Sequence, residues 1–217
     1  MSVIGCAGGN LTPSSAAEGA GRMGVYLHYQ AMPDDSRLAR LLRAERLLCV
    51  MYCEVIHRPA GPWDTVRLPL NDFDETLSSI ADNPAFGSLG TAMQAYDDLR
   101  AELERAEREY PGLRRRAAYF KLIDFDAQLA RGLAAAGRPD AEWLADSLVW
   151  GTERFAPDGF GGRNVTLQRV PSPLVADAAV QLRGVGPEAF DWRADDWAAF
   201  RGVYAEAAAR GESIVIA

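Results

Sequence analysis

The sequence predicts one α/β or α+β domain, in which helices flank a mixed β-sheet as packed layers. Two observations predict this fold class. Apolar residues recur at helical spacing in several segments, and short apolar runs typical of strands separate those segments. Helices that alternate with short strands pack on a sheet in layers. The chain has 217 residues, of which 48% are hydrophobic, so it can bury a full core.

The first strand and the first helix are predicted near residue 25. Two sets of side chains alternate with the period of a strand: Val25, Leu27 and Tyr29, and between them Tyr26, His28 and Gln30. Pro33 to Ser36 then form a helix-start signal. The following run, Leu47 to Ile56, is almost wholly apolar, so it fits either a continuing helix or a buried strand.

The longest predicted helix spans residues 91–110, with Thr91 as its cap and Pro111 as its end. Tyr96, Leu99 and Leu103 fall on one apolar stripe at helical spacing. A basic triplet at 114–116 follows this helix. We interpret the triplet as a solvated turn, because three isolated arginines in an acidic protein form no basic patch.

The C-terminal half also alternates between strands and helices. One of its helices, which opens at Pro139, is expected to bury Trp143, Leu144 and Leu148. A glycine-rich loop covers 151–164. The other predicted elements are a strand at 119–123, a helix at 124–136, a strand at 165–169, a helix opening at Ser172, a helix at 195–210 and a strand at 213–216.

Residues 1–22 are expected to be a flexible leader, and residues 23–217 the domain. Glycine, serine and proline dominate the leader, which lacks the charged and apolar regions of a signal sequence. The three cysteines form no disulfide framework. These features together predict a cytoplasmic protein.

The charge balance argues against two classes of partner. The net charge is −7, whereas non-specific nucleic-acid binding needs a basic surface to displace counterions. An anionic membrane surface is disfavoured for the same reason. No stretch approaches the roughly 18 apolar residues of a membrane span. We therefore expect neither nucleic acid nor a membrane as partner.

Cys49, Cys53 and His57 form the sharpest candidate metal site. They are spaced by four residues, which places them on one face of a helix and, equally, on one face of a strand. Thiolates and imidazole suit zinc, but a structural zinc site usually has four ligands. The alternative is that both cysteines are small core residues.

A catalytic cleft is the second candidate, lined by His28, Asp124 and Asp126. Histidine titrates near neutral pH and can act as a general base. A nucleophilic site also needs a serine or cysteine beside the base, and the sequence names none. His28 as a hydrogen-bonded structural residue, and the two aspartates as helix-capping residues, are the competing interpretations.

Several motifs resemble the YfbM-like family of bacterial proteins. The opening is Met23–Leu27 followed by Pro33–Leu38. Further along, Gly159-Phe160-Gly161 leads to a strand and to a proline-led helix that ends in Ala179-Val180-Gln181-Leu182. An aromatic helix over 200–209 and a terminal strand close the chain. The resemblance covers 23–217 in patches and implies a single α/β domain without an assigned activity.

The chain departs from this family in one motif. Family members often open a helix with Asp-x-Asp-Lys-x-Trp. Here Asp124-Phe125-Asp126 is followed by Ala127, Gln128 and Leu129, so no role that depends on the lysine or tryptophan carries over. Residues 58–112 also look like additional sequence.

The absence of a complete catalytic set favours a non-catalytic binding or interaction protein without a cofactor. Its partner would be a second copy, giving a homodimer, or an unidentified protein, because five tryptophans and seven tyrosines can supply an aromatic contact surface. The alternative is a small-molecule enzyme that uses the cleft with His28, Asp124 and Asp126.

Overall fold

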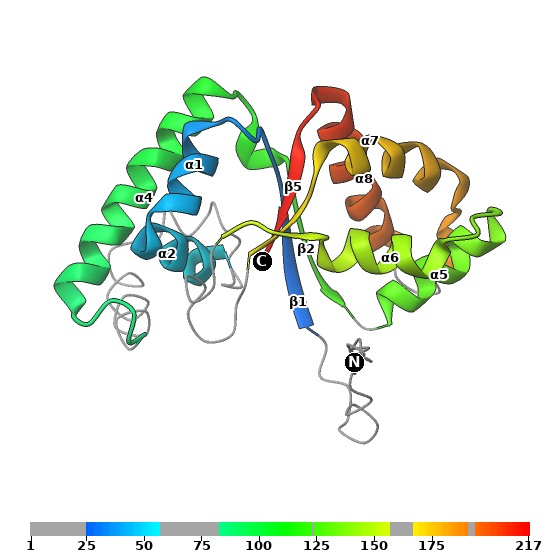
Figure 1. The fold of residues 1–217 in the computed structure, drawn as a ribbon, viewed down its shortest axis with the longest axis horizontal. Coiled ribbons are helices and arrows are strands. Elements are labelled where there is room, and N and C mark those ends of the chain that lie inside the picture. Colours follow the sequence, from blue (N-terminus) through cyan, green and yellow to red (C-terminus); the bar gives the residue numbers. More distant parts are fainter. Residues whose placement is uncertain (1–24, 57–82, 123, 157–166, 191–193) are drawn as a thin grey trace, which may run out of the picture.

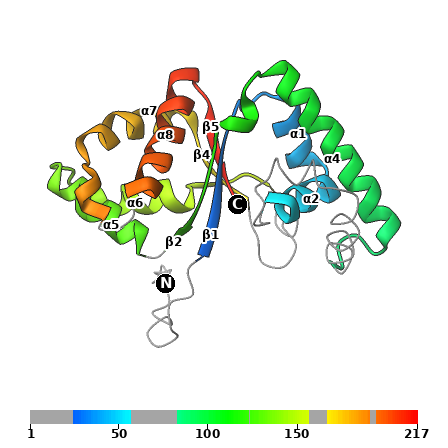
Figure 2. The same ribbon diagram turned by 180° about the vertical axis from the view of Figure 1, so that it is seen from behind.

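The computed structural model describes residues 25–56, 83–122, 124–156, 167–190 and 194–217. A central β-sheet separates two groups of helices, with α1, α2 and α4 on one side and α5 to α8 on the other (Figure 1). The view from behind shows the same two groups on either side of the sheet (Figure 2). The predicted fold class, a sheet flanked by helices, is confirmed.

The sheet has five strands in the order β2-β1-β5-β4-β3. All pairings between these described strands are antiparallel, which corrects the expectation of a mixed sheet and selects the α+β alternative. The strands are β1 (Val25–Met32), β2 (Ala117–Leu122), β3 (Glu153–Arg154), β4 (Gln168–Val170) and β5 (Ser213–Ile216).

Four helices cover one face of the sheet and enclose the larger core. They are α5 (Phe125–Ala135), α6 (Ala141–Trp150), α7 (Ser172–Gln181) and α8 (Ala194–Arg210). Leu27, Tyr29 and Ala31 of β1 belong to this core, as the alternation of the strand predicts. Phe190 and Trp197 stack with ring centroids 4.4 Å apart. Trp197, Phe200, Tyr204 and Ala207 are buried along α8.

Three helices form the second core on the opposite face: α1 (Arg37–Ala44), α2 (Arg46–Ile56) and α4 (Leu89–Glu109). Met32 of β1 and Val215 of β5 belong to this core. The apolar run at 47–56 is therefore a helix rather than a strand. Short 3-10 turns complete the described chain: η2 (Leu113–Arg115), η3 (Leu182–Gly184) and η4 (Pro187–Phe190).

Two local predictions are wrong. The cap of α4 is Ser88, whose side chain accepts a hydrogen bond from the Thr91 backbone N–H, so α4 begins earlier than predicted. Trp143 is 57% exposed instead of buried. Helical spacing alone does not say which edge of an apolar stripe meets the core.

Among the described helices, none is long and apolar enough to cross a membrane.

Two buried tyrosines anchor the C-terminal end of α6. The Tyr29 hydroxyl donates to the Val149 carbonyl at 2.7 Å, and the Tyr204 hydroxyl donates to the Leu148 carbonyl at 2.6 Å. The last carbonyls of a helix have no partner within the helix, so these bonds satisfy acceptors that burial would otherwise leave without a hydrogen bond. Burial raises the pKa of both phenols well above the ordinary value.

A buried ion pair joins the starts of β2 and β5. Arg116 and Glu212 directly precede these strands and are 5% and 4% exposed. The Arg116 Nη1 donates to Glu212 Oε1, and Nη2 donates to the Pro111 carbonyl at 2.9 Å. This corrects the interpretation of the basic triplet as a solvated turn, because its last arginine is a core residue.

Replacing Arg116 with methionine should lower the free energy of unfolding by about 3–5 kcal/mol, because Glu212 would keep a buried, uncompensated charge. Urea denaturation measures this change. The matched control is Arg115→Met, since Arg115 is exposed and such surface changes shift stability by about 0.5 kcal/mol or less. Equal effects of the two substitutions would contradict a structural role for the pair. The double variant Arg116→Met/Glu212→Leu should recover part of the loss.

Two helical glycines should respond in opposite directions to alanine. A Cβ at Gly132 in α5 would lie 2.6 Å from Val185 Cγ1, whereas a Cβ at Gly202 in α8 would meet nothing within 4 Å. We expect Gly202→Ala to stabilise the protein by about 0.5–1 kcal/mol. Gly132→Ala should destabilise it by about 1–3 kcal/mol through overpacking. Thermal unfolding of both variants measures these changes. If Gly132→Ala stabilised the protein, the close packing of α5 against Val185 would be refuted.

Candidate functional site: the α5–α6 groove

His28 lies in the middle of the sheet and is 1% exposed. Its backbone N–H donates to the Ala217 carbonyl at 3.0 Å, and its carbonyl accepts from the Ala217 N–H at 3.0 Å. The alternation of β1 turns its side chain away from Leu27 and Tyr29, and therefore away from the α5–α8 core. The structure does not bring His28 into the pocket that Asp126 lines.

The two predicted aspartates occupy different positions. Asp124 precedes α5 with a left-handed φ of 55°. Asp126 lies in the first turn of α5, where its Oδ1 accepts from the Ala127 N–H at 2.8 Å. A carboxylate at this position is favoured by the positive end of the helix dipole. Of the three predicted cleft residues, only Asp126 lines a described pocket on this face.

Cys49 and Cys53 lie one turn apart on α2 and are buried in the second core. A hydrogen bond with Cys49, together with burial, raises the pKa of the Cys53 thiol well above its ordinary value. His57 lies outside the described residues, so the three-residue metal hypothesis stays a prediction. Within the described ranges, no group of three or more histidine, cysteine or acidic residues is placed to hold a metal.

A groove between α5 and α6 is the candidate functional site, and we call it the α5–α6 groove. Its volume is about 580 Å³. The two helices pack as a hairpin, and small side chains on both leave the space between them open. Its alanines are Ala127, Ala130 and Ala134 from α5 and Ala141 and Ala145 from α6, and its charged residues are Asp126, Arg131, Glu142 and Asp146.

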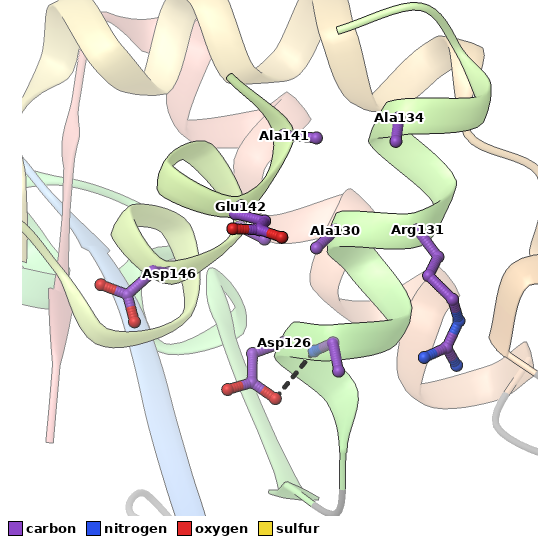
Figure 3. Close-up of a pocket in the computed structure, with 9 residues that line it drawn as sticks. Asp126, Ala130, Arg131, Ala134, Ala141, Glu142 and Asp146 are labelled. Carbon is purple, nitrogen blue, oxygen red and sulfur yellow. Dashed lines mark hydrogen bonds between the residues drawn. The ribbon is translucent and has the colours of Figure 1, made fainter. Parts of the chain in front are cut away.

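The carboxylates dominate one side of this groove. Glu142 extends across it toward Ala130, Asp126 and Asp146 lie beside it, and Arg131 extends from the other side of α5 (Figure 3). Within the described chain, neither Glu142 nor Asp146 forms an ion pair. The Asp126 carboxylate also adds to the raised pKa of Tyr29, second to burial. The lining of the groove therefore carries three carboxylates and one guanidinium, a net negative charge.

Two exposed tryptophans lie on α6, the helix that supplies one wall of the groove. Trp143 is 57% exposed and Trp150 is 37% exposed. With a helical step of about 100° per residue, Glu142, Trp143, Asp146 and Trp150 fall within an arc of about 100°. All four are exposed. This face of α6 therefore combines negative charge with large apolar side chains, and tryptophan is enriched at contact surfaces.

Carboxylates are the only candidate nucleophiles in the described lining of the groove. Its described lining contains no serine, cysteine, histidine or lysine. Carboxylates there can accept hydrogen bonds from ammonium or guanidinium groups, and alanines allow close approach of apolar side chains. Sequence reasoning missed Glu142 and Asp146. The sequence shows that Glu142 and Asp146 are four residues apart and that Trp143 is next to Glu142. Only the tertiary structure shows that this face of α6 is exposed.

Comparison with protein-family models, with curated proteins and with solved structures finds no match to this chain. The resemblance to YfbM-like proteins therefore stays a prediction, and the function is to be inferred from the residues of the site.

The buried cysteines should be chemically silent in the folded protein. A raised pKa lowers the thiolate fraction at neutral pH, and burial blocks access, so Cys53 should react with a disulfide reagent at least about a hundredfold more slowly than after unfolding. The measurement is thiol titration with and without urea in a Cys6→Ser background, because Cys6 lies outside the described residues. Rapid native labelling of either cysteine would contradict the described packing of α2.

Proposed function

We propose that this chain is a non-catalytic binding protein whose α5–α6 groove accepts a basic segment of a protein partner. One observation carries the proposal: three carboxylates lie beside an alanine-lined floor on an open face, and no described cation pairs with Glu142 or Asp146. Unpaired carboxylates on a partly apolar surface attract lysine and arginine side chains and select against acidic partners.

The shape of the groove suits an amphipathic segment. Alanines from two helices leave room for larger apolar side chains of a partner to approach both backbones. Trp143 and Trp150 add exposed apolar area on α6. Tryptophan is enriched among residues whose loss strongly weakens protein interfaces. A helix with leucine on one face and lysine at its margins would meet apolar and acidic groups in the same arrangement.

The acidic charge of the groove supports the expectation that nucleic acid and anionic membranes are not partners. Membership of the YfbM-like family, with a bacterial and cytoplasmic setting, is proposed on the motifs described above. A homodimer is a weaker form of the proposal, because a second acidic copy would place like charges against each other. An enzyme using His28 is not favoured, since that side chain is buried away from the groove.

A designed amphipathic helix of leucine and lysine tests the groove. The protein should bind this peptide in preference to one with glutamate at the lysine positions, and binding should weaken as salt rises because the charges are exposed. Fluorescence anisotropy of the labelled peptide gives the affinity. Glu142→Gln should weaken binding about three- to tenfold through loss of one exposed charge contact.

The matched control is Glu206→Gln, which removes an exposed carboxylate from α8 outside the groove and should leave the affinity unchanged. Trp143→Ser tests the apolar contribution and should also weaken binding. Equal affinity for the two peptides, or equal losses in Glu142→Gln and Glu206→Gln, would refute the groove as the binding site.

A further inference from the structure

A second pocket lies at the edge of the sheet where β1 ends and β2 and β5 begin, and we call it the sheet-edge pocket. Its volume is about 600 Å³, and it shares no residue with the α5–α6 groove. Segments from both halves of the chain meet there, because antiparallel pairing brings the end of β1 next to the starts of its two neighbours. Six charged residues line it: Asp34, Asp35, Glu109, Arg116, Arg210 and Glu212.

Internal bonds neutralise half of these charges. Asp34 accepts from Arg169 Nη1 at 2.8 Å and from Ser213 Oγ at 2.7 Å. Arg116 and Glu212 pair with each other. Asp35, Glu109 and Arg210 form no ion pair with any described residue. The pocket thus presents two carboxylates and one guanidinium that no described ion pair neutralises.

The N-terminus of α7 adds a second positive pole. Ser172, the first residue of this ten-residue helix, lines the pocket. The residue before it is Pro171, which provides no side-chain cap, and no acidic residue occupies the first turn. Uncapped N–H groups and the helix dipole favour a negative group at such an end. Gly211 and Arg210 reach the same pocket from the end of α8.

Two buried polar atoms of residues that line the pocket provide an independent observation. Arg116 Nε and Glu212 Oε2 have no hydrogen-bond partner among the described residues, although their residues are 5% and 4% exposed. Buried polar groups nearly always have partners, so each such atom calls for an explanation. One is a donor and the other an acceptor. A bound molecule with both an acidic and a basic group can reorient this pair and satisfy both.

We propose that the sheet-edge pocket binds a small zwitterion, a free α-amino acid. Its carboxylate lies at the N-terminus of α7 and toward Arg210, and its ammonium lies toward Asp35 and Glu109. The volume falls within the roughly 300–1,000 Å³ of pockets that hold small ligands. A ligand with only one sign of charge would gain from one pole and be repelled by the other. This site is a function in addition to partner binding at the α5–α6 groove.

The experiment is a calorimetric titration of the full chain with each standard amino acid. We expect at least one to bind with a dissociation constant of about 1 mM or tighter. The deamino and decarboxy analogues of that amino acid, which each carry a single charge, should bind at least about tenfold more weakly. Arg210→Gln and Asp35→Asn should each weaken binding of the amino acid by a similar factor. Both residues are exposed, so these variants should fold normally.

Arg201→Gln is the matched control, since it removes an exposed arginine from α8 outside both the sheet-edge pocket and the α5–α6 groove and should leave amino-acid affinity unchanged. Three results would each overturn the proposal: no standard amino acid binds at about 10 mM, a single-charge analogue binds as well as its parent, or Arg210→Gln weakens binding no more than Arg201→Gln does. None of these results depends on the peptide experiment, so the two sites can fail separately.

Discussion

The position of β1 constrains the whole molecule. This strand pairs with β2 on one side and β5 on the other, and helices bury both of its faces. A central strand covered on both faces must match two cores at once, since successive side chains point in opposite directions. Leu27, Tyr29 and Ala31 serve one core and Met32 the other. Both helical layers therefore depend on the register of one eight-residue segment.

Several polar side chains buried in this double core donate hydrogen bonds to backbone carbonyls. Gln30 is fully buried and its Nε2 donates to the carbonyls of Ala31 and Leu113 at 2.9 and 3.0 Å. Tyr29 and Tyr204 donate to carbonyls at the end of α6. These bonds give the three side chains structural roles. Two open, charge-bearing surfaces, the α5–α6 groove and the sheet-edge pocket, lie away from the centre of β1.

The two candidate sites have different origins. The α5–α6 groove is formed by two helices that are neighbours in the sequence, and its acidic character follows from side chains on consecutive turns. The sheet-edge pocket is assembled from the ends of β1, α4 and α8 and the start of α7. Charges of both signs come together in it only because segments distant in the sequence meet there. A binding protein with one acidic surface and one mixed-charge pocket can combine partner recognition with occupancy by a small molecule.

The sequence by itself determined that helices flank a sheet, most of the described helices and strands, and the buried stripes of α4 and α8, because local periodicity encodes them. It left 47–56 open between helix and strand and placed a loop where β3 lies. It named Asp126 among the candidate site residues but neither Glu142 nor Asp146. Tertiary structure alone decided that all described strands pair antiparallel, that His28 is sealed inside, that Trp143 faces outward and that Arg116 is a buried ion-pair partner. Each of these outcomes depends on which distant segment packs against a residue, and periodicity along one segment carries no information about that neighbour.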